Sequence, residues 1–153
     1  MGLDMYLSAK KHLGKYQNEE EADKVRKLFP EMYKSGNLDY IEVSFEVGYW
    51  RKANQIHKWF VDNCQNEVDE CQRSYVSREQ LRELLKICKI ILNSSKKDKV
   101  KKAEEMLPVQ RGFFFGGVEY DEYYFMDLEE TIKIMERCLT LPEEWEFEYH
   151  SSW

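Results

Sequence analysis

The strict alternation of apolar and polar residues between Ile41 and Val47 constrains the fold more than any other feature of the chain. The alternating residues are Ile41, Glu42, Val43, Ser44, Phe45, Glu46 and Val47. A period of two places the apolar side chains on one face of a β-strand and the polar ones on the other. The segment therefore predicts a strand with one buried face, which we expect to end at Gly48.

Two shorter segments, 3–7 and 145–149, alternate in the same way and predict two more strands. Apolar residues at helical spacing predict four helices, which are Asn18–Met32, Tyr49–Gln65, Ser77–Leu92 and Asp127–Leu139. Capping boxes at Asn18, Ser77 and Asp127 support three of these starts. We predict an α+β fold of one domain, residues 1–153, in which a small antiparallel or mixed sheet of about three strands is packed by four or more helices.

The segments between these elements contain turn formers and charges. Ser35-Gly36-Asn37 predicts a turn, and the polar segment Gln65–Tyr75 predicts a loop. The lysines within Lys96–Lys102 predict either a solvated helix face or a mobile loop.

Charge and composition exclude several classes of protein. The 153 residues carry a net charge of −6, which argues against binding to duplex nucleic acid. Their apolar runs are too short to cross a bilayer, and the amino-terminal segment lacks the pattern of a secretory signal. We therefore expect a cytoplasmic protein without membrane contact, whose four cysteines are reduced thiols.

The predicted helix Tyr49–Gln65 contains polar side chains on its apolar face. Trp50, Asn54 and His57 are spaced to share that face with Val61 and Cys64. Buried polar groups must be hydrogen-bonded, so Asn54 and His57 indicate either a structural network or a ligand pocket. Arg51 and Lys52 at the helix start are available to bind an anion.

A second candidate segment runs from Gly112 to Tyr124. Phe113, Phe114 and Phe115 lie between glycines, and the chain continues into an acidic, tyrosine-rich stretch. One interpretation is a buried β-hairpin or a short core strand. The other is an aromatic platform beside carboxylates, for which the candidate residues are Phe114, Tyr120, Asp121 and Tyr123.

Sequence signatures of common enzymes are missing. The chain has no HExxH, GxSxG or CxxC motif. His57 could act as an acid/base with a nearby carboxylate. A zinc site from His57, Cys64 and Cys71 would require the following loop to fold back. We expect no metal and no cofactor.

Three segments taken together resemble a family of small, largely uncharacterised proteins of phages, prophages and bacterial genomes. They are Gly2-Leu-Asp-Met-Tyr-Leu7, Val47–Phe60 with its GYWRKANQIHKWF sequence, and Gly112–Tyr124 with GFFFG and EYDEYY. The resemblance covers most of the chain and carries no established activity. It implies an accessory role, such as counter-defence.

These observations lead to a function hypothesis and an alternative. The first is a non-enzymatic binding protein for a small polar, nucleotide-like ligand or for a host protein. Its ligand site joins Trp50, Arg51, Asn54 and His57 to the Phe114–Tyr123 segment. The alternative is a nucleotide-directed hydrolase or transferase that uses His57 as its acid/base.

Overall fold

The computed structural model describes residues 2–33 and 40–153. Its elements, in chain order, are β1 (Asp4–Gly14), α1 (Glu19–Leu28), the 3-10 helix η1 (Pro30–Tyr33), β2 (Tyr40–Arg51), α2 (Asn54–Cys64), β3 (Ser74–Val76), α3 (Arg78–Leu92), α4 (Lys99–Met106), α5 (Glu122–Leu139) and β4 (Glu146–Ser152). The turn predicted at Ser35-Gly36-Asn37 lies outside the described residues.

The strands form a four-stranded sheet in the order β2-β1-β4-β3, and all its pairs are antiparallel. The predicted α+β class is thereby confirmed, and β1, β2 and β4 are the three predicted strands. The fourth, β3, has three residues, which is too short to show a period.

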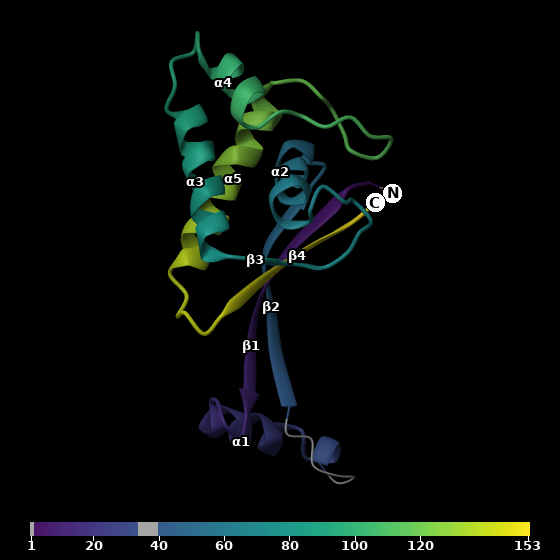
Figure 1. Ribbon diagram of the computed structural model, residues 1–153, viewed down its shortest axis with the longest axis vertical. Helices are drawn as coiled ribbons and strands as arrows, with labels where there is room; N and C mark the ends of the chain where they lie inside the picture. Colours follow the sequence, from purple (N-terminus) through teal and green to yellow (C-terminus); the bar gives the residue numbers. More distant parts are fainter. Residues whose placement is uncertain (1, 34–39) are drawn as a thin grey trace.

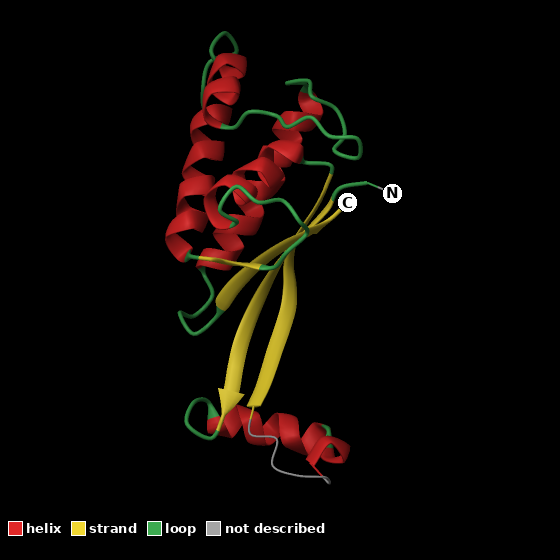
Figure 2. Ribbon diagram, turned by 45° about the vertical axis from the view of Figure 1, so that its right-hand side comes forward, coloured by secondary structure: helices red, strands yellow, loops and turns green. Residues whose placement is uncertain are grey.

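Helices α2, α3 and α5 lie on one face of the sheet, and none of the described helices covers the other, which we call the open face (Figure 1). The β1–β2 ribbon extends beyond these helices and ends beside α1 (Figure 2). The core lies between sheet and helices, where Met5 and Leu7 of β1 meet Phe60 of α2 and Met135 of α5. Of the helices described, none is both long and apolar enough to cross a membrane.

The predicted end of β2 at Gly48 is wrong, and so is the helix start at Tyr49 or Trp50. The strand continues through Trp50 to Arg51, because Asp4 and Met5 of β1 pair with these residues. Gly48 lies under α5, where an added Cβ would be 2.7 Å from a methyl of Ile134. The glycine therefore permits close packing of helix on strand instead of ending the strand.

Only one of the three predicted capping boxes is present. The Ser77 side chain and Gln80 form the reciprocal pair that starts α3, as predicted. Asn18 instead adopts a left-handed conformation, and its side chain donates to the His12 carbonyl oxygen at 3.1 Å. Helix α5 begins earlier than predicted, with Asp121 as its N-cap, six residues before the predicted Asp127.

The segment between α3 and α5 contains two stretches for which the sequence left alternatives open, the lysine-rich stretch and the Gly112–Tyr124 stretch. The lysine-rich stretch becomes helical from Lys99, as the start of α4. The Gly112–Gly116 segment forms a turn, so the interpretation as a buried β-hairpin or a short core strand is wrong. Of its three aromatic side chains, Phe113 is 95% exposed and Phe115 is buried in the core.

Candidate functional site

The turn between β2 and α2 presents a lysine in an unusual backbone conformation. Lys52 has φ +60°, in the left-handed region that non-glycine residues seldom occupy. Its N–H donates to the Leu3 carbonyl oxygen at 2.8 Å, and its own carbonyl oxygen accepts from Asn54 N–H at 2.9 Å. Strained residues of this kind concentrate at functional sites.

Asn54, the first residue of α2, holds the loop that follows α4. Its Nδ2 donates to the carbonyl oxygens of Phe115 at 3.0 Å and Gly117 at 2.7 Å. Its Oδ1 accepts from the backbone N–H of Gln110 at 2.9 Å. Each polar atom of this buried amide is therefore occupied, and Asn54 is a positioning residue for residues 110–117.

Gly116 brings this loop against the β2–α2 turn. It has φ +87°, and an added Cβ would lie 2.9 Å from Lys52 Cβ. Both the conformation and the space require glycine here. The contact sets the distance between the loop and Lys52.

Helix α5 supplies the opposite wall of the site. The Asp121 carboxylate accepts from the backbone N–H groups of Tyr123 and Tyr124, each at 3.1 Å, and so fixes the helix start. This start turns Asp127 toward α2, where Gln55 Nε2 donates to Asp127 Oδ2 at 3.0 Å. Burial raises the pKa of the Asp127 carboxyl to about 6, and the hydrogen bond from Gln55 lowers the pKa by a smaller amount.

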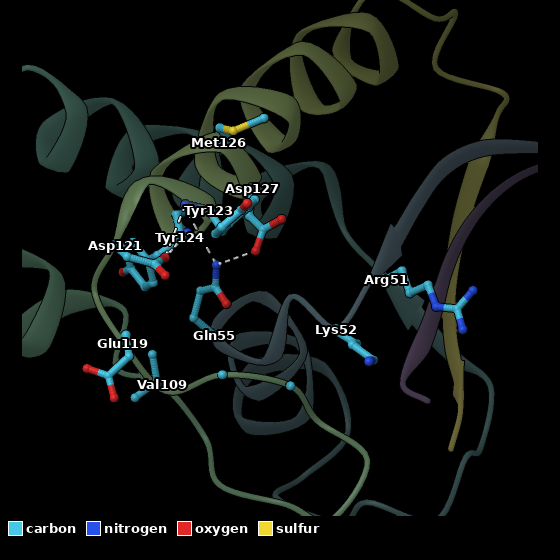
Figure 3. A pocket seen from close by; sticks show the side chains of 12 residues that line it. Arg51, Lys52, Gln55, Val109, Glu119, Asp121, Tyr123, Tyr124, Met126 and Asp127 are labelled. Carbon is cyan, nitrogen blue, oxygen red and sulfur yellow. Dashed lines mark hydrogen bonds between the residues drawn. The ribbon is translucent and has the colours of Figure 1, made fainter. Parts of the chain in front are cut away.

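These walls enclose a pocket of about 360 Å³. Its lining residues are Arg51, Lys52, Gln55, Val109, Gly116, Gly117, Glu119, Asp121, Tyr123, Tyr124, Met126 and Asp127. Figure 3 shows the acids and Gln55 at one end and the two cations at the other, with Lys52 nearer to Gln55 than Arg51 is. Both ends of the pocket are therefore polar, and the two ends carry opposite charge.

His57 lies outside this pocket, in a buried hydrogen-bond network. Its Nδ1 is 2.7 Å from the Tyr149 hydroxyl, and its Nε2 is 2.8 Å from Asp69 Oδ2. Asp69 Oδ1 accepts from Trp153 Nε1 at 3.0 Å. Burial raises the pKa of Tyr149 well above its usual value, so the phenol stays protonated. The network ties the carboxyl-terminal strand and the 65–73 loop to α2.

The remaining predicted residues separate from one another. Trp50 is buried on β2 and donates from Nε1 to Thr131 Oγ1 at 2.9 Å, so it does not share a helix face with Asn54 and His57. The carbonyl oxygen of Phe114 accepts from Leu3 N–H at 3.0 Å, and its side chain packs against the core. The Tyr120 hydroxyl accepts a hydrogen bond from the backbone N–H of Val109 at 3.3 Å. Of the predicted ligand-binding residues, Arg51, Asp121 and Tyr123 line the pocket.

Sequence reasoning missed Gln55 and Asp127, a hydrogen-bonded pair that lines the pocket. A signal for Asp127 exists, because it lies three residues after Tyr124 and four before Thr131, both of which are buried. A carboxylate within a helix's buried stripe needs a partner or a ligand. The misplaced helix start hid this pattern.

No group of three or more His, Cys, Asp or Glu side chains in residues 2–33 and 40–153 is arranged to hold a metal ion. Cys88 and Cys138 are buried in the core, and burial raises the pKa of the Cys88 thiol to about 12. Both therefore serve packing.

Comparison of the chain with protein-family models, with curated proteins and with solved structures gives no match. What defines the protein is therefore its own architecture: an α+β fold with one open sheet face and a charge-divided pocket between α2 and α5.

Proposed function

We propose that the protein binds a small, polar, anion-bearing ligand of nucleotide type in the pocket between α2 and α5. The observation that supports this proposal is the division of charge within one pocket. Lys52 and Arg51 at one end suit a phosphate, and Asp127 with Gln55 at the other end suits a group with hydrogen-bond donors. The volume of about 360 Å³ falls in the range of small-molecule sites.

The binding proposal is favoured over the alternative with His57 as acid/base. The His57 side chain has no exposed surface, and both ring nitrogens are already hydrogen-bonded. An acid/base must come within hydrogen-bond reach of the substrate, directly or through one water. The geometry gives His57 a positioning role for α2, β4 and the 65–73 loop.

The test is calorimetric titration with nucleoside monophosphates and inorganic pyrophosphate, on the wild type and on Lys52→Ala. Lys101→Ala is the matched control, since Lys101 is 75% exposed on α4, away from the pocket. We expect binding that Lys52→Ala weakens at least tenfold and Lys101→Ala leaves unchanged. Binding that is insensitive to Lys52→Ala, or no binding at millimolar concentrations, would refute the proposal.

A host protein is the second candidate partner, and the open sheet face supports it. Glu46 and Glu148 lie on this face, since both are paired in register with Ser8. Glu148 is already paired with Lys10 at 3.0 Å and with Arg73 at 2.9 Å, so Glu46 is the carboxylate that a basic protein surface would complement. Within this proposal, the resemblance to phage and prophage proteins favours an accessory, counter-defence role. Glu46→Lys should then abolish capture of the host partner without changing the nucleotide titration.

A further inference from the structure

The two edges of the sheet differ in length. β3 forms one edge with 3 residues, whereas β2 forms the other with 12. An edge strand presents backbone N–H and C=O groups that another strand can pair with, and natural proteins keep such edges short or cover them. Among the described strands, none pairs with the outer side of β2. The edge of β2 is therefore the place where this sheet can be extended.

Contacts with α5 limit the part of this edge that is available. Arg137 donates from Nη2 to the Val47 carbonyl oxygen at 2.7 Å. The next residue, Gly48, lies directly under α5. The available edge therefore consists of Tyr40–Glu46, on the part of the ribbon that extends beyond α2, α3 and α5 (Figure 2).

Apolar side chains are exposed around this segment. Ile41, Val43 and Phe45 are paired in register with the core-facing side of β1, yet Phe45 is 58% exposed. At the end of the ribbon, η1 lies beyond the β2 side in both views (Figures 1 and 2). Three large apolar side chains of α1, its C-cap and η1 are more than half exposed there, namely Leu28, Phe29 and Met32. Exposed apolar side chains that gather in one region indicate an interface.

A second copy of the same segment matches the alternation of this edge. Side chains directly opposite each other in an antiparallel pair lie on the same face of the sheet, so apolar residues must meet apolar residues. When Tyr40–Glu46 pairs along its full length with its own copy, the two-fold axis passes through Val43. Val43 then faces Val43 of the second copy, and Ile41 faces its Phe45. The apolar side chains of both strands thus meet on one face.

The carboxylates favour the same alignment. With the axis at Val43, Glu42 faces Ser44 of the second copy. Glu46 in turn faces its Tyr40, so each carboxylate meets a side chain that bears a hydroxyl. An axis at Ser44 would instead place Glu42 against Glu46, and like charges directly opposite each other destabilise a strand pair.

We infer that the chain forms a two-fold dimer in which the β2 edges of two copies pair around Val43 into one continuous sheet. The pairing brings Phe45 of the second copy to the end of the ribbon, where Leu28, Phe29 and Met32 cover it. Two-fold dimers with a self-complementary surface are the commonest oligomers. None of the residues that line the pocket between α2 and α5 belongs to Tyr40–Glu46, so the dimer is independent of the proposed function.

Sedimentation velocity of the full chain measures this association. Ser44→Glu places a carboxylate against Glu42 of the second copy on both sides of the axis, and Ser44 is exposed, so circular dichroism should show an unchanged fold. Lys101→Ala is the matched control, because it changes the net charge by the same amount on α4, far from the ribbon (Figure 1). We expect the wild type and Lys101→Ala to dimerise equally, and Ser44→Glu to raise the dissociation constant at least tenfold.

Cysteine cross-linking tests the alignment of the two strands. Oxidation should join Val43→Cys to its own copy, because opposed residues have Cβ atoms about 4.5–5.5 Å apart. Ile41→Cys and Phe45→Cys should each stay unlinked alone and form a covalent dimer when the two are mixed. The wild type controls for Cys64 and Cys71, which are partly exposed.

Three results would overturn the inference. The first is a wild type that stays monomeric at submillimolar concentrations. The second is a dimer whose dissociation constant Ser44→Glu leaves unchanged, since its interface would lie elsewhere. The third is cross-linking of Ile41→Cys or Phe45→Cys alone without cross-linking of Val43→Cys, which would show a different alignment.

Discussion

Replacement of His57 by alanine tests whether this residue is structural. The change removes the bond to the Tyr149 hydroxyl, which has no exposed surface, and a buried group left without its partner costs roughly 1–3 kcal/mol. The vacated ring volume beside Phe115 costs about 2 kcal/mol more, at the low end of large-to-alanine core changes. Asp69 is 19% exposed, so water replaces its lost bond at little cost. The expected loss is about 4 kcal/mol, a large part of a stability of roughly 5–15 kcal/mol.

Urea unfolding monitored by circular dichroism measures this loss. With a slope of about 2 kcal/mol/M, the midpoint should fall by roughly 2 M. His12→Ala is the control, because His12 lies partly exposed on the open sheet face, and we expect it to shift the midpoint by less than about 0.5 M. A His57→Ala protein that keeps its midpoint but loses ligand binding or turnover would refute the structural role and restore the acid/base alternative.

Three further predictions concern the pocket. Gly116→Ala should lower the free energy of unfolding by about 1–3 kcal/mol in urea, because residue 116 has a left-handed conformation and the new Cβ would collide with Lys52. Gly117→Ala should be neutral, because no atom lies within 4 Å of its Cβ. Equal effects of the two changes would contradict this geometry. The pKa of the Asp127 carboxyl is about 6 in the folded protein against 3.8 for a free carboxyl, so this group opposes folding increasingly as the pH rises from 3.8 to 6. Asp127→Asn should therefore be roughly 2–3 kcal/mol more stable than the wild type at pH 7.5 and equally stable below pH 3.8. A stability difference that does not change with pH would contradict the buried carboxyl. Asn54→Ala should accelerate hydrogen exchange throughout residues 110–117 and cost about 2–3 kcal/mol; unchanged exchange there would show that other contacts hold the loop.

Local patterns predicted the elements whose limits are set locally. The alternation in 41–47 reports burial of one strand face, and the reciprocal Ser77–Gln80 cap lies within a single turn of α3. The extension of β2 to Arg51 depends on pairing with Asp4, 47 residues earlier, and no neighbouring residue encodes it. The helix start predicted at Asp127 is wrong, because Asp121 caps α5 and Asp127 lies inside the helix, where it is hydrogen-bonded to Gln55 of α2.

In the candidate site, too, local patterns predicted some features, whereas features that depend on long-range contacts were missed. Helical spacing predicted that Asn54 and His57 face inward. Of the two interpretations of this pair, the structural hydrogen-bond network agrees with the contacts of both residues. The pocket itself forms where the 110–117 loop, α2 and α5 meet. Since Asn54 reaches this loop from 56 to 63 residues away, no local pattern could predict the arrangement.

An NMR titration with GMP tests whether a ligand binds between Lys52 and Asp127. The Gln55 side-chain amide is the best reporter, because it donates to Asp127 inside the pocket. We predict saturable shifts of this amide and of the Lys52 and Gly117 backbone amides, with those near His57 unchanged. Shifts confined to the open sheet face or to the surroundings of His57, or no shifts at all, would contradict binding between these two residues.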